Sequence, residues 1–373
     1  MFDIAVVGAG INGCSAAYFL HRAGMNVVLI DKEGVAAGGS GAAGAFISPK
    51  FSKSGPLKEV VEEAYRFSLG FYNANFPEHI INAPLLHIAK YADEDAKVAA
   101  FKASTTLETG EAPEETVALL QDEAKAHESV YLKRSAVVDA HAMCEALCKD
   151  VTYLQESIDS LSYDDGCWSV GSVTAKRVIL TTGAYRKLID EAYIRLRPVW
   201  GHRIDAKIAL QMNSIVHHLL SISVTKPDGT VGIGATHDVH FHPDSGEEYQ
   251  LETGRKELLE KARATLKFDG IEVVRDYTGL RSGTNDYMPI IGPLVDAKTS
   301  LAVLPELLKG AKVPTENLTY HPEAYMINGS GGYGYVLAPY LAQQLCEHIV
   351  NGSPLDEALI PARFFYRSAK RGG

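Results

Sequence analysis

The stretch that decides the fold reads IAVVGAGINGCSAAYFLHRAGMNVVLID and covers residues 4–31. An apolar strand, a glycine turn, a helix and a second strand follow one another here, which is the pattern of a dinucleotide-binding unit. Gly8 allows the tight turn, Gly10 lets the backbone approach a pyrophosphate, and Gly13 lets the helix pack closely on the strand. Asp31 ends the second strand where a carboxylate accepts hydrogen bonds from a ribose hydroxyl. These residues alone favour NAD and FAD equally.

The composition is that of a globular protein large enough for two lobes. The chain has 373 residues, of which 46% are hydrophobic and 22% are charged, and no apolar stretch is long enough to predict a membrane span. The first strand begins at the N-terminus without a signal-like segment, so we expect a cytoplasmic protein. The five cysteines form no CxxC pair, which predicts reduced, mostly buried thiols.

The charge balance argues against extended, non-specific binding to nucleic acid. The formal net charge is −10, and the sequence pI is about 5.7. This balance does not exclude a local basic patch. The C-terminal RFFYRSAKRGG supplies a candidate, with Arg363, Arg367, Lys370 and Arg371 interleaved with aromatic residues. A solvated tail explains the same residues, and it is slightly favoured.

A histidine-rich stretch, THDVHFHP, raises the question of a metal site. Strand alternation would place His240 and His242 on one face, with His237 nearby. Histidine is a common zinc ligand, but no cysteine lies near these residues, so we predict no metal.

The rest of the chain alternates helical and strand patterns. The small-residue segment VAAGGSGAAGAFISPKFS follows the second strand, so we expect it near the cofactor crevice. Further along the chain we predict a helix over 57–76, a helix-rich stretch to about 125, a hairpin over 162–170, a strand from 178, strands over 197–205 and 222–243, a helix over 250–267 and a glycine loop entering a helix over 328–344.

Four separated pieces together resemble one family. They are Gly8 to Asp31, Ser40 to Gly44, Thr181 to Ala184, and Gly279 to Gly292 with the later glycine loop. In this combination the sequence resembles the FAD-dependent amine and amino-acid oxidases, which include glycine oxidase, D-amino-acid oxidase and sarcosine oxidase. The resemblance runs from the first strand to the last helix.

The resemblance implies non-covalent FAD as the cofactor, and it implies which residues surround it. The first unit would hold the ADP half, the small-residue segment would lie near the flavin, and the last glycine loop would cap the isoalloxazine ring. Carried over, the cofactor-binding residues are Gly8, Gly10, Ile11, Asn12, Gly13, Asp31, Lys32, Ser40, Gly41, Ala43, Gly44, Ala45, Ile158, Thr182, Gly183, Arg281, Gly331, Gly332, Tyr333 and Gly334.

Within the family, the sequence most resembles the oxidase domain of tRNA-modifying enzymes of the MnmC type. The segments that carry this likeness are GGSGAAGAFISPKFSKSGPL, GTNDYMPIIGPLVD and INGSGGYGYVLAP. The sequence departs from the pattern at Ala42, where asparagine is common, and at His202, which replaces a glutamine. The last loop also lacks an arginine, and the methyltransferase domain that accompanies many of these oxidase domains is absent from the sequence.

The implied reaction is oxidation of the C–N bond of a secondary amine that carries a carboxylate. Arg281 matches the arginine that holds a substrate carboxylate, a task that suits a planar guanidinium. Tyr333 and His202 are further candidates for the catalytic site. The expected substrate is 5-carboxymethylaminomethyl-uridine at the tRNA wobble position, with a separate methyltransferase as a further partner. The alternatives are a glycine, sarcosine or D-amino-acid oxidase or dehydrogenase acting on a free small amino acid, and a flavin-binding protein without catalysis.

We therefore expect an α/β fold in which a Rossmann-like FAD-binding domain is interleaved with an α+β substrate domain on a mostly antiparallel sheet. The FAD-binding domain is expected over residues 1–56, 130–195 and 275–373. The substrate domain, with its helical insertion, is expected over 57–129 and 196–274.

Overall fold

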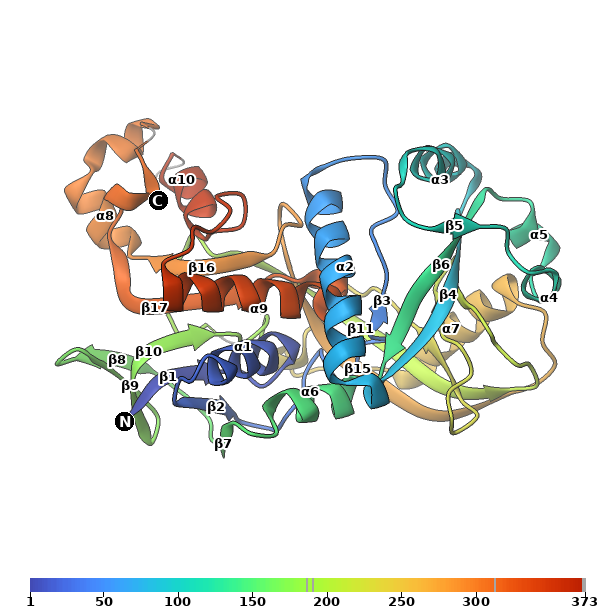
Figure 1. Ribbon diagram of the computed structural model, residues 1–373, viewed down its shortest axis with the longest axis horizontal. Helices are drawn as coiled ribbons and strands as arrows, with labels where there is room; N and C mark the ends of the chain where they lie inside the picture. The colour runs from blue at the N-terminus through green and yellow to red at the C-terminus, as the bar shows by residue number, and fades with distance from the viewer. Residues whose placement is uncertain (186, 190, 312, 371–373) are drawn as a thin grey trace. The chain divides into compact units, whose positions relative to one another are not determined.

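Two compact units make up the structure, a computed structural model that describes residues 1–185, 187–189, 191–311 and 313–370. Each unit is assembled from separated segments, so each mixes colours from distant parts of the chain in Figure 1. Unit 1 contains residues 1–37, 144–198 and 281–373, and unit 2 contains residues 38–143 and 199–280.

Unit 1 is built on a mostly parallel sheet with the strand order β16-β17-β10-β1-β2-β7. The central strand β1 (Phe2–Val7) pairs in parallel with β2 (Val27–Asp31) and with β10 (Val173–Leu180). An antiparallel β16 completes one edge, and the hairpin β8–β9 joins β10. The other strands of this sheet are β7 (Thr152–Gln155), β8 (Leu161–Asp164), β9 (Cys167–Val170), β16 (Ile290–Val295) and β17 (Tyr320–Asn328).

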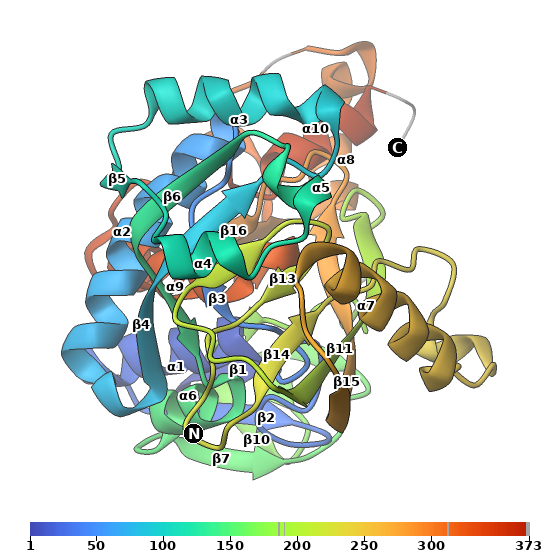
Figure 2. The same ribbon diagram turned by 90° about the vertical axis from the view of Figure 1, so that its right-hand side faces the viewer.

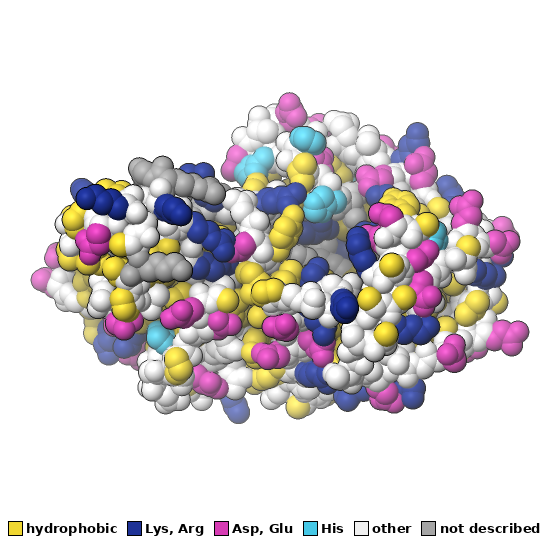
Figure 3. Space-filling view, turned by 90° about the horizontal axis from the view of Figure 1, so that it is seen from above, with side chains coloured by type: hydrophobic (Ala, Val, Ile, Leu, Met, Phe, Trp, Pro, Cys, Tyr) yellow, Lys and Arg dark blue, Asp and Glu magenta, His cyan; other side chains and the backbone are white. Residues whose placement is uncertain are grey.

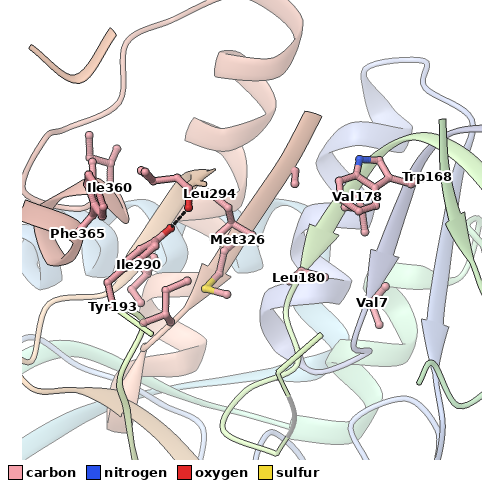
Figure 4. Close-up of a cluster of buried hydrophobic side chains, with 14 of the residues drawn as sticks. Val7, Trp168, Val178, Leu180, Tyr193, Ile290, Leu294, Met326, Ile360 and Phe365 are labelled. Carbon is pink, nitrogen blue, oxygen red and sulfur yellow. Dashed lines mark hydrogen bonds between the residues drawn. The ribbon is translucent and has the colours of Figure 1, made fainter. Parts of the chain in front are cut away.

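The central strand is buried on both faces, which explains its continuous apolar sequence. Ile4, Ala5 and Val6 have no exposed surface. Ala5 and Val7 belong to a hydrophobic cluster whose labelled members in Figure 4 include Val7 and Phe365, so the last helix is part of this core. The helices of this unit are α1 (Ile11–Arg22), α8 (Ala297–Val303), α9 (Gly334–Asn351) and α10 (Ala362–Ala369), with α6 (Ala140–Cys148) beginning in unit 2.

Unit 2 is built on a mostly antiparallel sheet with the order β15-β11-β14-β13-β12-β4-β6-β3, and β5 pairs with β6. Strand β12 departs from this pattern by pairing in parallel with β4. The strands of this sheet are β3 (Phe46–Ile47), β4 (Ile80–Ile88), β5 (Thr109–Gly110), β6 (Ser129–Val138), β11 (Leu196–Ile208), β12 (Ile215–His217), β13 (Ser221–Ile222), β14 (Val231–Gly234) and β15 (Ile271–Thr284). The long strands β11 and β15 each contain a boundary between the two units.

Helices pack on both faces of this second sheet because neighbouring residues of a strand point in opposite directions. Leu85 joins a cluster with Phe101 of α3, whereas Leu86 joins a cluster with Leu258 of α7. Helix α7 (Leu251–Thr265) lies beside β14, as Figure 2 shows. The helices of unit 2 are α2 (Pro56–Asn75), α3 (Ala92–Ser104), α4 (Glu114–Ala118), α5 (Asp122–Lys125) and α7 (Leu251–Thr265).

The predicted fold class and the main predicted elements are confirmed. The helix expected over 57–76 is α2, the helix expected over 250–267 is α7, and the glycine loop enters α9. The hairpin over 162–170 is β8–β9. Compared with the expected domain ranges, residues 38–56, 130–143 and 275–280 lie in unit 2, and residues 196–198 lie in unit 1. The first two differences arise because β3 and β4 both pair with β6.

The preference for a solvated C-terminal tail was wrong. Residues 362–369 form α10, and Phe364 and Phe365 are buried. Arg363 donates to Asp286 and to the carbonyl oxygen of Met288, so it anchors this helix. Arg367 stays exposed, and Arg371 lies outside the described residues.

Charges of both signs are mixed on the surface shown in Figure 3, in keeping with the modest net charge of −10. Across the described ranges, no helix is both long enough and apolar enough to cross a membrane.

Candidate cofactor and active site

The glycine turn between β1 and α1 is closed by contacts that exclude a side chain. Gly8 has a φ of +108°, and a Cβ there would lie 2.6 Å from the carbonyl oxygen of Thr181. A Cβ at Gly13 would overlap the carbonyl oxygen of Gly8 and lie 2.7 Å from Thr181 Oγ1. That hydroxyl donates to the carbonyl oxygens of Val7 and Gly8. The end of β10 thus locks the turn, as close helix–strand packing requires.

Two helix N-termini lie side by side in unit 1. Helix α1 starts after Gly10 and α9 starts after Tyr333, and neither has a side-chain cap. Ser330 Oγ lies 3.2 Å from Asn12 Oδ1, and a Cβ at Gly334 would lie 3.4 Å from Ile11 Cγ2. Because neither helix has a side-chain cap, the positive ends of both helix dipoles favour an anion such as a pyrophosphate here.

Asp31 is oriented by backbone amides at the end of β2. Its Oδ2 accepts from Ala9 N at 2.8 Å, and its Oδ1 accepts from Glu33 N and Gly34 N. A carboxylate offers about four acceptor positions, so Oδ2 keeps capacity for a ribose hydroxyl. The adjacent Lys32 forms an exposed ion pair with Glu33.

A buried asparagine that the sequence analysis missed connects the other predicted cofactor segments of unit 1. Asn328 ends β17 with 1% of its surface exposed. Its Nδ2 donates to the carbonyl oxygen of Gly183, and its Oδ1 accepts from Ser282 Oγ at 2.6 Å. The position of Asn328 directly before the glycines of the last loop is a signal that could have identified it.

The predicted catalytic side chains of unit 1 are partly buried. Burial lowers the pKa of Arg281 below its usual 12.5 and raises the pKa of Tyr333 to about 12. Arginine is not deprotonated in proteins, so Arg281 remains a cation despite this shift, and the raised pKa of Tyr333 keeps it a neutral phenol near neutral pH. Next to Tyr333, a Cβ added at Gly331 or Gly332 would meet no atom of the described chain within 4 Å, so this side of the loop is open.

Two further predicted cofactor residues of unit 1 are Ile158 and Thr182. Ile158 is 6% exposed and belongs to the hydrophobic cluster of Figure 4. Thr182 follows Thr181 at the end of β10, directly before Gly183.

The small-residue loop of residues 38–45 belongs to unit 2 and packs tightly there. A Cβ at Gly279 of β15 would lie 2.8 Å from Ala42 Cβ and 2.9 Å from Gly39 Cα. Arg203 Nε donates to the carbonyl oxygen of Ala42 at 3.1 Å. This loop contains the predicted cofactor residues Ser40, Gly41, Ala43, Gly44 and Ala45.

His202 is fully buried within unit 2. Its Nε2 lies 2.9 Å from Asp276 Oδ1, and its Nδ1 lies 3.5 Å from the hydroxyl of Tyr249. Arg255 pairs with the same carboxylate of Asp276, and a Cβ at Gly254 would overlap the imidazole ring. Because both ring nitrogens already face partners, we give His202 no part in the proposed mechanism.

One group of ligand-type side chains stands out in the part of the chain that is described. Glu191, Asp296 and His321 place one ligand atom each within 4.8 Å of one another. Glu191 Oε1 lies 2.6 Å from His321 Nε2, and Asp296 caps α8 by accepting from Thr299 N. These contacts join the chain near residue 191 to β17 and α8, so we interpret the group as structural.

The residues of unit 1 fit a dinucleotide cofactor. There is no room for a side chain at Gly8 or at Gly13, neither helix has a side-chain cap at its N-terminus, and Asp31 retains an acceptor position. The class defined by this fold and site is a dinucleotide-binding oxidoreductase. Residues 3–348 match the family model described as FAD dependent oxidoreductase, and the chain belongs to that family. Its cofactor is therefore FAD.

The curated relatives include bifunctional proteins of tRNA modification. The chain is 24% identical over 401 residues to the tRNA 5-methylaminomethyl-2-thiouridine biosynthesis bifunctional protein MnmC of Leptospira interrogans, covering 99% of this chain and 61% of the relative. The MnmC protein of Dichelobacter nodosus is also 24% identical, with 99% of this chain and 59% of the relative covered. The chain thus spans about three fifths of the length of these relatives.

Solved structures share the fold over nearly the whole chain. Glycine oxidase from Bacillus cereus superposes with a TM-score of 0.73 at 18% identity, covering 95% of this chain and 96% of that one. Iminodiacetate oxidase from Chelativorans sp. gives a TM-score of 0.72 at 18% identity, covering 96% and 99%.

Proposed function

We propose that this protein oxidises the C–N bond of a secondary amine bearing a carboxylate, and that its substrate is 5-carboxymethylaminomethyl-uridine at the wobble position of tRNA. The observation that carries the proposal is the alignment with MnmC proteins over 98–99% of the chain. It is supported by the resemblance of three separate segments, around residues 38–57, 283–296 and 327–339, to the oxidase domain of these proteins.

The chemistry is a two-electron oxidation followed by hydrolysis. Bound FAD would supply the two-electron acceptor for the hydride of the glycyl methylene, and the glycine turn and Asp31 of unit 1 would hold its ADP half. The nitrogen lone pair forms the new C=N bond, and the N–H proton passes to solvent. Water then cleaves this imine to glyoxylate and aminomethyl-uridine. The primary amine that results can accept a methyl group, so a separate methyltransferase is the proposed next partner. A tRNA substrate also agrees with the cytoplasmic location expected from the sequence.

The protein mainly has to bind and orient the substrate and exclude water. We assign Arg281 to the substrate carboxylate, because its guanidinium remains charged although burial lowers its pKa. Tyr333 lies beside the open glycines of the last loop, where a neutral phenol can cover a ligand and donate one hydrogen bond. No protein acid or base is required for the hydride step.

Anaerobic mixing of the FAD-loaded protein with tRNA tests this proposal. Transfer RNA bearing the carboxymethylaminomethyl group should bleach the flavin, whereas the same tRNA bearing only the aminomethyl group should not. Glycine, sarcosine and D-alanine at matched concentration should bleach it poorly. Efficient bleaching by a free amino acid, with none by the modified tRNA, would overturn the tRNA assignment.

The second candidate is an oxidase or dehydrogenase of a free small amino acid. The TM-scores of 0.73 and 0.72 to glycine oxidase and iminodiacetate oxidase favour it, although at 18% identity they establish only the fold. Iminodiacetate therefore belongs in the same substrate panel. A third hypothesis, a flavin-binding protein without catalysis, predicts that no member of the panel bleaches the flavin.

A further inference from the structure

Arg203 is a buried cation in unit 2 whose contacts converge on the loop of residues 38–45. It lies on β11, and 7% of its surface is exposed. Its Nη1 donates to Asp205 Oδ1 at 2.7 Å, and its Nε donates to the carbonyl oxygen of Ala42 at 3.1 Å. A buried charge is stable only when it is paired and hydrogen-bonded, and this guanidinium uses a loop carbonyl for part of that requirement.

The guanidinium is held rigidly from several sides. Its Cζ lies 3.7 Å from the centre of the Tyr277 ring, which is a close cation–π contact. The hydroxyl of Tyr277 donates to Asp205 Oδ2, so the ring and the carboxylate are fixed together. On the neighbouring strand, a Cβ at Gly234 would lie 2.5 Å from Arg203 Cβ, so only glycine leaves room for the arginine.

Asp205 forms ion pairs with two cations, Arg203 and Lys226. Lys226 Nζ lies 2.7 Å from the same Oδ1 that accepts from Arg203. Lys226 is the more exposed of the two, with 22% of its side chain accessible against 9% for Arg203. The two cations therefore share one carboxylate, and it is Arg203 whose guanidinium links that carboxylate to the loop backbone.

Strand β15, the neighbour of β11 in the sheet, also packs closely against the loop. A Cβ at Gly39 would overlap the carbonyl oxygen of Leu280, and a Cβ at Gly279 would press on Ala42 and Gly39. Gly279 and Arg203 thus fix the same short segment, one by close backbone packing and the other by a charge-assisted hydrogen bond.

We propose that Arg203 is a positioning residue, which holds the loop of residues 38–45 in the conformation that receives bound FAD. The proposal rests on the expected place of this loop near the flavin and does not depend on the substrate. Arg203 acts through the carbonyl oxygen of Ala42. Its partners Asp205 and Tyr277 keep the guanidinium aligned, so that the loop is ordered before the cofactor arrives.

The test uses two conservative substitutions at the same carboxylate. Arg203→Lys keeps the charge but cannot reach both Asp205 and the Ala42 carbonyl with the geometry of a guanidinium. We expect it to weaken FAD binding by roughly ten- to hundredfold, the effect of losing one charge-assisted hydrogen bond. The visible circular dichroism of the bound flavin should change as well. Lys226→Arg replaces the other cation on Asp205 and should leave both the affinity and the spectrum unchanged.

A second variant, Gly279→Ala, perturbs the loop of residues 38–45 while Arg203 is retained. Gly279→Ala should reproduce the loss of affinity and the altered flavin spectrum, because its Cβ presses on Ala42. Thermal unfolding of the apoprotein shows whether each variant folds. Unchanged FAD affinity and flavin spectrum in folded Arg203→Lys and Gly279→Ala would overturn the proposal. Equal effects from Lys226→Arg would also overturn it, because Arg203 would then be only a core residue. Bleaching of the flavin by modified tRNA is measured in a separate assay. Failure of the Arg203 proposal can therefore be distinguished from failure of the tRNA proposal.

Discussion

Replacing Gly13 with alanine should separate α1 from the strand turn on which it packs. The added Cβ would overlap the carbonyl oxygen of Gly8 and lie 2.7 Å from Thr181 Oγ1, and neither atom belongs to the flexible end of a long side chain. Restoring ordinary contact requires the helix to move by more than about 1 Å, and overpacking of this kind costs roughly 1–3 kcal/mol.

We expect the upper part of that range, because Thr181 Oγ1 is already committed to the carbonyl oxygens of Val7 and Gly8. The same displacement moves the N-terminus of α1, so FAD affinity should fall by about 100-fold, which corresponds to roughly 3 kcal/mol. The assay combines thermal unfolding of the apoprotein with FAD titration followed by flavin fluorescence.

Gly70 provides a matched control, since it is also a helical glycine but an added Cβ there would have no atom of the described residues within 4 Å. Gly70→Ala should stabilise the protein by up to about 1 kcal/mol, through helix propensity, and leave FAD binding unchanged. If Gly13→Ala behaves like Gly70→Ala in both assays, close packing at the turn is required neither for stability nor for FAD binding.

Three further predictions follow from the structure. Arg281→Ala should leave the bound flavin spectrum intact while flavin reduction by a carboxylate-bearing amine collapses, and unchanged reduction kinetics would contradict the carboxylate assignment. Burial lowers the pKa of His217 and His218 to about 4, against 6.5 in an unfolded chain, so the unfolded state takes up protons first as the pH falls. The stability that these two neutral histidines contribute is complete above about pH 6.5 and is lost as the pH falls towards 4. His218→Asn should make the free energy of unfolding, measured with urea, fall less steeply over this pH range. An equally steep fall in the variant would contradict this assignment. Arg363→Ala should destabilise the fold by about 2–3 kcal/mol because Asp286 loses a partly buried partner, whereas the exposed Arg367→Ala should change stability by less than about 0.5 kcal/mol in the same urea assay.

The sequence was most informative where local chemistry dictates structure. Gly8 and Gly13 could be assigned to a tight turn because positive φ and close helix packing exclude a side chain at those positions. Asp31 could be placed because it follows directly from a buried strand. The strand–turn–helix–strand pattern that reveals these residues lies within about 30 residues, the length of a βαβ unit. The contact with Thr181 that closes the turn comes from a distant strand end and was not visible in that pattern.

Other features depend on distant partners and were missed. Arg203 and His202 are adjacent polar residues on one strand, and the pattern does not show that both are buried, because their partners Asp276 and Tyr277 lie more than 70 residues away. The C-terminal helix was mistaken for a tail because its basic residues suggested exposure. Arg363 is instead oriented inward by Asp286, which no local pattern reveals.

Analysis of the products of a single anaerobic turnover shows whether this protein oxidises the wobble nucleoside of tRNA. The FAD-loaded protein would be mixed with tRNA bearing carboxymethylaminomethyl-uridine, and the wobble nucleoside would be identified by mass spectrometry alongside glyoxylate. We expect aminomethyl-uridine and glyoxylate in equal amounts, each matching the amount of flavin reduced. Unaltered carboxymethylaminomethyl-uridine in a mixture whose flavin is readily reduced by a free amino acid would contradict it.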